Sequence, residues 1–198
     1  MFVPEPAVII GDHDGFGGRG VTFRTPGRAG TTGQKLMALH NATGSTIRVR
    51  INKVRVDLVQ TVIKAVTVLP PVIRLWKFTA VPTNGTVLNK TPGNSGNPAS
   101  SASVTLWGDA SADGTSSASA LTVTLPAGTF VAQEFATRMI TAAGYEGADR
   151  NEFLATEQGD IMLNALEGLC VFLDYTLATQ NPTTDMWLAT MFWEEYAP

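Results

Sequence analysis

Between residues 46 and 58 the apolar residues recur at every second position, and this spacing constrains the fold most narrowly. The first members of the series are Ile47, Val49 and Ile51. Alternation of apolar and polar residues is typical of a β-strand with one buried face. After Ile51 the apolar residues fall on even-numbered positions, beginning with Val54. Because a slip of one residue turns side chains to the opposite face, we expect a β-bulge or strand break at Asn52-Lys53.

Similar short patterns return along the whole chain and predict an all-β fold. Strand signals begin near Leu36, and further strands are expected at 62–69, 72–81, 104–107, 121–125, 161–163, 168–177 and 186–195. Turn signals separate them, among them Pro70-Pro71 and Asn84-Gly85, where glycine suits a positive φ. We therefore expect a jelly-roll-like antiparallel sandwich or barrel.

One helix is expected at most, over residues 131–143. Val131, Phe135 and Met139 recur there at intervals of four residues, and Gly144 would end the helix. The preceding Gly-Thr-Phe sequence suits a strand equally well, so a strand is the alternative for this segment.

The first 33 residues differ from the remainder and predict a separate extended arm. They contain eight glycines and show neither strand nor helix periodicity. An extended segment of this length spans roughly 100 Å, so it reaches onto another subunit. We expect an arm over 1–33 that a neighbouring subunit orders, and a β-sandwich domain over 34–198.

Charge and targeting signals exclude several classes of protein. The net charge is −3 and the sequence pI about 5.3, whereas proteins that bind nucleic acid usually carry a basic excess. We expect no secretion signal and no membrane span, because no apolar run approaches ~18 residues. The single cysteine, Cys170, permits no disulfide within the chain and is flanked by apolar residues, which predicts a buried thiol.

Candidate catalytic and cofactor sites are weak. Residues 15–20 match the pattern G-x-G-x-x-G, but no helix start follows, so we expect no nucleotide site. Asp12-His13-Asp14 and His40 would need to converge to hold a metal, and we expect loop and turn roles instead. Glycoside hydrolysis would need a pair of carboxylates, and the acidic residues that could supply them are Asp149, Glu152, Glu157 and Asp160. The prediction is a protein that is not an enzyme and has no cofactor or metal.

Positive charge is most concentrated on the first alternating strand. The residues concerned are Arg48, Arg50, Lys53 and Arg55. Arg48 and Arg50 share a face, and the bulge decides whether Arg55 joins them. Two interpretations stand equal: a contact surface for an anionic protein partner, or an exposed sheet face whose charges prevent aggregation.

The last two strands carry apolar residues on both faces and predict self-association. In 169–177 and 186–195 neither face is polar, so a second subunit is expected to cover one of them. Trp187 and Trp193 are the predicted partner contacts on the last strand, beside Arg48, Arg50 and Arg55.

Several segments together resemble small virion structural proteins of tailed bacteriophages of the jelly-roll type. The segments are Leu39-His40-Asn41 leading into 46–54, then 72–86, 167–176 before Asn181-Pro182, and 187–195. The resemblance covers about residues 34–195 and departs in the Ser/Ala/Gly-rich loops and in 130–144. It implies a capsid decoration or cement protein, or alternatively a tail or neck component.

The same resemblance implies partners and a location. It implies a homotrimer that binds other virion proteins such as the major capsid protein, with no direct nucleic-acid or membrane contact. The protein would be made in the host cytoplasm and reside in the virion. From another class of function, a receptor- or carbohydrate-binding β-sandwich module is the alternative.

Overall fold

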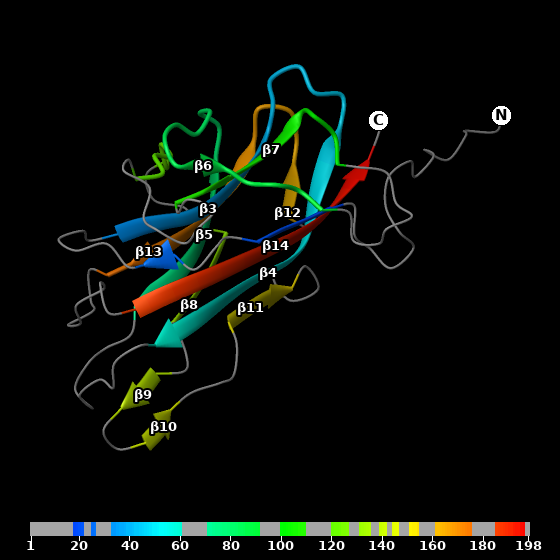
Figure 1. Cartoon of the computed structure of the whole chain (residues 1–198). Coiled ribbons are helices and arrows are strands. Elements are labelled where there is room, and N and C mark those ends of the chain that lie inside the picture. The colour runs from blue at the N-terminus through cyan, green and yellow to red at the C-terminus, as the bar shows by residue number, and fades with distance from the viewer. Residues whose placement is uncertain are drawn as a thin grey trace.

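The structure, a computed structural model, consists of β-strands and connecting segments in the part of the chain that it describes (Figure 1). The described residues are 18–21, 25–26, 33–60, 71–91, 100–109, 120–126, 131–135, 139–141, 144–146, 151–154, 161–175 and 185–196. Every strand pairing is antiparallel, and the strands form two main sheets that do not close into a barrel within these ranges. The predicted all-β, sandwich-like fold is confirmed.

The first sheet is built around two long neighbouring strands. β4 (Arg48–Gln60) and β14 (Asp185–Tyr196) pair along their whole lengths. The other edge of β14 pairs with β1 (Gly18–Val21) and β2 (Thr25–Pro26). The other edge of β4 pairs with β12 (Ile161–Leu163) and β11 (Asn151–Leu154). This pair of strands is therefore flanked by short strands on both sides.

The second sheet has β3 and β13 at its centre. In spatial order its strands are β6 (Thr86–Val87), β7 (Val104–Gly108), β3 (Gly33–Asn41), β13 (Gly168–Asp174), β5 (Val72–Phe78) and β8 (Ala132–Phe135). A separate hairpin is formed by β9 (Met139–Thr141) and β10 (Gly144–Glu146).

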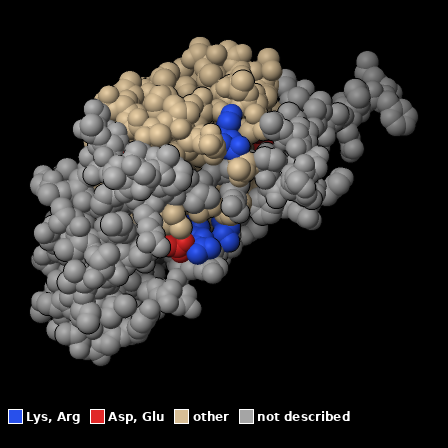
Figure 2. Space-filling model, viewed as in Figure 1, with Lys and Arg blue, Asp and Glu red and all other residues tan. Residues whose placement is uncertain are grey.

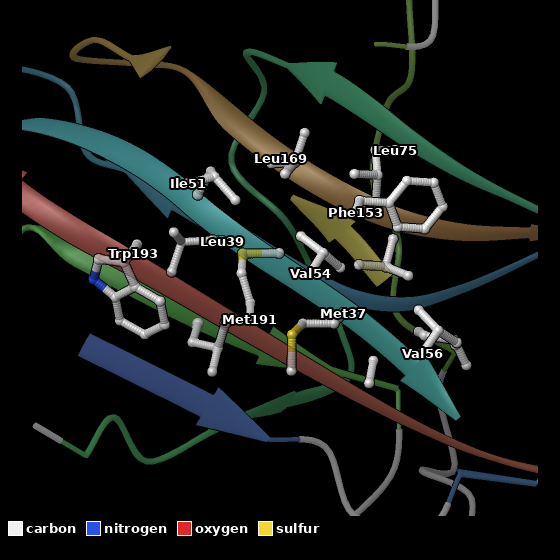
Figure 3. Packing of buried hydrophobic residues seen from close by; sticks show 14 of the residues in the cluster. Met37, Leu39, Ile51, Val54, Val56, Leu75, Phe153, Leu169, Met191 and Trp193 are labelled. Atoms are coloured by element: carbon white, nitrogen blue, oxygen red, sulfur yellow. The ribbon is translucent and has the colours of Figure 1, made fainter. Parts of the chain in front are cut away.

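The main core lies between the two sheets. Figure 3 shows Met37, Leu39 and Leu169 of the second sheet packed with residues of the first. The contributions of the first sheet include Ile51, Val54, Val56, Met191 and Trp193. A second, smaller cluster on the outer face of the second sheet contains Ala38, Phe78 and Cys170 beneath the segment 120–126. The second sheet is thus apolar on its inner face, and on its outer face around Ala38, Phe78 and Cys170, where the segment 120–126 covers it.

The predicted bulge is confirmed at Asn52. Phe192 of β14 pairs with Lys53, and the next residue, Trp193, pairs with Ile51, so β14 skips Asn52. The extra residue keeps Val49, Ile51, Val54 and Val56 all buried despite the slip in the pattern. β12 pairs with the part of β4 before the bulge and β11 with the part after it.

A second bulge, which the sequence did not indicate, lies in β3. Val171 of β13 pairs with Met37 and Phe172 with Lys35, so Leu36 is the extra residue. Leu36 and Met37 are consecutive and both buried in the main core. This explains why residues 33–41 show no clean alternation.

The turn after β5 has the predicted backbone conformation. Asn84 and Gly85 have φ values of 59° and 67°, in the left-handed region that these two residues tolerate best. The prediction of a positive φ at Gly85 is confirmed, whereas the positive φ of Asn84 was not predicted.

The helix predicted over 131–143 is wrong. Residues 132–135 form β8 on the edge of β5, and residues 139–141 form β9. An interval of four residues is a multiple of two, so it fits strand alternation as well as a helix.

Two predicted strands are not found as predicted. The strand expected over 121–125 is reduced to one bridge, between Thr83 and Thr122, and the strand expected over 62–69 lies outside the described residues.

Part of the expected arm belongs to the domain's own sheet. Residues 18–21 pair with residues 190–193 of β14 in the same chain, and Thr25 pairs with Trp187. We expected a neighbouring subunit to hold these residues in place, and for them that expectation is corrected. A glycine-rich segment can pair through its backbone as an edge strand even though its side chains show no periodicity. Most of the remaining arm residues lie outside the described part.

Candidate interaction face on the first sheet

The bulge at Asn52 gathers the basic residues of β4 on one side of the first sheet. Val49, Ile51 and Val54 point into the core, so the intervening side chains point outward. Arg55 therefore joins Arg48 and Arg50 on the outer face, a point that the sequence left open. We define the basic face as Arg48, Arg50, Lys53 and Arg55 of β4 with Leu188, Phe192 and Glu194 of β14.

Within the basic face the cations interact with neighbours in the same sheet. Arg50 Nη1 lies 3.6 Å from Glu194 Oε2. Arg55 forms two bonds with Asp57, from Nη2 at 2.8 Å and from Nε at 3.0 Å. The Lys53 ammonium lies 6.0 Å from the centre of the Phe192 ring. Such half-exposed pairs contribute little to folding, typically below ~1 kcal/mol each, but they hold the side chains in place.

The face remains basic after these pairs are counted. Among the side chains that the structure describes on this face, Arg48, Arg50, Lys53 and Arg55 outnumber the carboxylates of Asp57 and Glu194, and Arg48 is exposed. Figure 2 shows described basic side chains beside acidic ones on this side of the molecule. Leu188 and Phe192 are half-buried and add apolar area between the charges. A surface of this kind suits an anionic protein partner better than a small ligand.

The prediction that Trp187 and Trp193 contact a partner is wrong for this chain. Both side chains are 0% exposed and belong to the core between the sheets. They alternate with Leu188 and Phe192 on β14, so the outward positions of that strand carry smaller apolar groups. The two tryptophans are structural.

The two-faced apolar pattern of β13 is met within the chain at most positions. Leu169, Val171 and Leu173 face the main core, while Cys170 faces the smaller cluster under the segment 120–126. Phe172, on the same side as Cys170, stays partly exposed beside Trp76 and Lys35. Among the described side chains of β14, Leu188 and Phe192 are apolar and partly exposed.

The weaker sequence candidates do not assemble into a site in the described residues. Gly18 and Gly20 of the glycine-rich motif lie in β1, an edge strand rather than a strand-to-helix turn. Glu152 lies opposite Arg55 in the pairing of β11 with β4. Asp12-His13-Asp14, Asp149, Glu157 and Asp160 lie outside the described ranges. Within those ranges no group of three His, Cys, Asp or Glu side chains is placed to hold a metal.

Cys170 is buried as predicted. The thiol lies in the smaller cluster, and burial raises the pKa of Cys170 to about 12. The negative charge of Asp109 raises it further, while Lys35 opposes the shift. Because thiolate is the reactive form, this thiol is inert in the native protein.

His40 is a core residue rather than a turn residue. Its ring is 3% exposed and stacks on Phe78 with 5.9 Å between the ring centres. Its Nε2 atom has no hydrogen-bond partner. Burial lowers the pKa of His40 from 6.5, and a backbone hydrogen bond with Leu166 opposes part of that shift.

Folding stability should fall as the pH drops through 6.5, because the native state keeps His40 neutral while the unfolded chain protonates it. The stability contributed by neutral His40 is present above 6.5 and is lost as the pH approaches its lowered native pKa. Urea unfolding of the wild type and of His40→Gln between about pH 7.5 and 5 checks this. The gap between their midpoints should shrink on acidification, and parallel curves would contradict the prediction.

The sequence analysis did not identify a buried carboxylate, Glu195, near the end of β14. It is 0% exposed and accepts hydrogen bonds from Trp193 Nε1 at 2.8 Å and from the Ser101 backbone N–H at 2.8 Å. The Ser100 hydroxyl donates to the same carboxylate. The alternation of β14 would have found it, since Glu195 continues the inward series of Trp193.

A strained turn was also missed. Leu166, between β12 and β13, has a φ of 71°, which is unusual for a bulky residue. Leucine carries no turn signal, so only the backbone reveals this position.

No protein-family model, no curated protein and no solved structure matches the chain. In the described part, no helix has the length and apolarity needed to traverse a bilayer. The sandwich architecture and the basic face are accordingly the basis for a functional proposal.

Proposed function

We propose that this chain is a non-enzymatic structural protein of a bacteriophage virion that binds other virion subunits, as a capsid decoration or cement protein. The observation that carries the binding role is the alignment of Arg48, Arg50, Lys53 and Arg55 on one face by the Asn52 bulge. The assignment to a virion rests on the sequence resemblance given above. A tail or neck component is the alternative within the same class.

The basic face has properties suited to a static protein contact. Its two supporting strands pair over twelve positions, so the face is stiff and needs little ordering on binding. Charges alternate with Leu188 and Phe192, which offers both steering and apolar area. The partner that fits is an acidic surface of another virion subunit, such as the major capsid protein.

A sugar- or receptor-binding module receives less support from the described residues. Trp76 and Trp107 are half-buried, and Trp187 and Trp193 are fully buried. Trp76 also donates its ring N–H to the carbonyl of Pro126 at 3.1 Å. Two of the four rings are fully buried and the other two are half-buried, which leaves little ring surface on which a sugar would stack.

Particle association tests both parts of the proposal. Mass spectrometry of gradient-purified particles should detect the chain, and electron microscopy should place it on the outer surface. Absence from the particles would refute the virion assignment.

The role of the basic face is tested by replacing Arg48, Arg50 and Arg55 together with Ala. Loss of three surface charges, each worth up to ~1 kcal/mol, should weaken co-sedimentation with particles that lack this chain by about tenfold. The matched control replaces the same three residues with Lys and retains the charge. Unchanged binding of the alanine variant would exclude this face as the contact.

A further inference from the structure

The turn between β5 and β6 contains the one asparagine of the sequence that is followed by glycine, Asn84-Gly85. Asparagine is a chemically labile residue, because its side-chain amide can react with the backbone nitrogen of the next residue. Glycine at that next position carries no side chain to obstruct the approach. Asn84 is exposed, so water reaches both the amide and the product of the attack.

The backbone conformation of this turn favours the reaction. Asn84 has a φ of 59° and Gly85 a φ of 67°. The ring that forms when the Gly85 nitrogen joins the Asn84 side chain suits a type II′ turn, whose first central residue also needs a positive φ. A residue other than glycine usually has a negative φ and would first have to leave it. Asn84 already has the sign of φ that the ring requires.

The Gly85 peptide is not held by a hydrogen bond across the described turn 83–86. The Thr83 carbonyl, which would close the turn by accepting from Thr86, accepts instead from the Thr122 N–H at 2.8 Å. Among the described residues, no acceptor is found for the Gly85 N–H. Rotation of this one peptide toward the Asn84 side chain leaves both Cα atoms in place. The nitrogen that has to attack is therefore free to turn.

We propose that Asn84 deamidates spontaneously and that its isoaspartyl product releases the segment 120–126 from the outer face of the second sheet. The Gly85 nitrogen bonds to Asn84 Cγ, its proton ends on the side-chain nitrogen, and that nitrogen leaves as ammonia. Water then opens the succinimide ring at either carbonyl, which gives aspartate or isoaspartate. The reaction needs no catalyst and no redox partner, and it stands or falls independently of the basic face.

The turn is an attachment point of the segment 120–126. Thr83 and Thr122 exchange two backbone hydrogen bonds, of 3.0 and 2.8 Å. The Asn84 side-chain amide donates to the Thr122 hydroxyl at 3.3 Å. A Cβ atom added at Gly85 would lie 3.1 Å from Leu121 Cβ, so the Gly85 backbone packs directly on the segment. Leu121 in turn belongs to the smaller cluster that buries Cys170.

Isoaspartate would change this attachment in two ways. Its backbone runs through the former side chain, so the chain between Thr83 and Gly85 becomes longer by one CH₂ group and Gly85 shifts against Leu121. Its free carboxylate carries no N–H, so the hydrogen bond to the Thr122 hydroxyl loses its donor. The segment should then open more often and give reagents access to the buried thiol of Cys170.

Incubation of the full-length protein in mildly alkaline buffer, followed by peptide mass spectrometry, tests the modification. Asn84 should convert in the folded protein within about tenfold of its rate in the urea-unfolded chain, since only one peptide has to rotate. An isoaspartate-specific methyltransferase identifies the isoaspartyl form. Asn41 and Asn164, which precede alanine, are internal controls and should stay unchanged. A folded protein whose Asn84 stays intact while the unfolded chain converts would overturn the proposal.

Labelling of Cys170 by a thiol reagent tests the release. Incubated wild type should label at least about tenfold faster than fresh protein, in proportion to its isoaspartate content. The matched control is Asn84→Gly, which keeps a residue that adopts a positive φ but has no amide to lose. Incubation should leave its labelling rate unchanged. If incubation accelerates labelling of both proteins equally, or of neither, isoaspartate at this turn does not release the segment.

Discussion

Deletion of Asn52 is expected to abolish cooperative folding of the domain. Asn52 is the residue of β4 that β14 skips, and it allows Val49, Ile51, Val54 and Val56 to share the core. Without Asn52, either Val49 and Ile51 or Val54 and Val56 must turn outward. The arginines on that part of β4 would then turn inward. Burying each such side chain contributes ~1.5–3 kcal/mol, so two of them amount to ~3–6 kcal/mol. Buried arginine adds to this cost, and the total is comparable with the 5–15 kcal/mol stability of a whole domain.

Urea unfolding followed by tryptophan fluorescence measures the effect, since Trp187 and Trp193 are fully buried. The matched control is Asn52→Ala, which keeps the residue count and should change stability by no more than about 1 kcal/mol. A deletion variant with a cooperative transition near the wild-type midpoint would show that register in β4 is not set by the bulge.

The phase of the apolar pattern carried the most reliable structural information in the sequence. The slip after Ile51 was enough to locate the bulge, because period-two alternation cannot change phase without an extra residue. The same reasoning failed for β3, where Leu36 and Met37 are both buried and no phase is visible. It also failed for residues 131–143, where the spacing of four fits both helix and strand.

Strand partners and the cover of each face could not be read from alternation. Apolar residues on both faces of β13 show that both faces must pack against other residues. They do not show which segments supply those residues. The second cover of β13 is the segment 120–126, which places Leu121 and Val123 over Cys170. Alternation could not predict this cover of Cys170, because cover from a distant segment of the same chain leaves no local signal.

The candidate surfaces were predictable to different degrees. The row of arginines on β4 is visible in the sequence, and only the position of Arg55 needed the structure. By contrast, Leu166 carries no turn signal in the sequence, and its left-handed backbone is known only from its φ of 71°. Trp187 and Trp193 were misassigned because their alternation with Leu188 and Phe192 does not state which face is inside.

The second large effect is expected from Glu195→Ala. The carboxylate joins β14 to the segment before β7, because it accepts from Trp193, Ser100 and the Ser101 backbone. Lys90 donates to the Ser101 carbonyl at 2.6 Å and lies within the electrostatic influence of Glu195, which opposes the lowering of the Lys90 pKa by burial. Removal of the carboxylate leaves buried donors without their acceptor and a half-buried ammonium without its counter-charge.

Breaking a buried network of this kind typically costs ~3–5 kcal/mol, because the remaining polar groups stay desolvated without partners. The adjacent Glu194 supplies a matched control. It is the same residue type on the same strand, but it faces outward, where it pairs with Arg50 at 3.6 Å. Glu194→Ala should therefore cost no more than ~1 kcal/mol. If urea unfolding shows equal losses for the two variants, Glu195 does not hold the two sheets together at this end. A loss at Glu195 several times larger would establish that the buried carboxylate, and not the charge of the strand end, stabilises the contact between β14 and the loop that precedes β7.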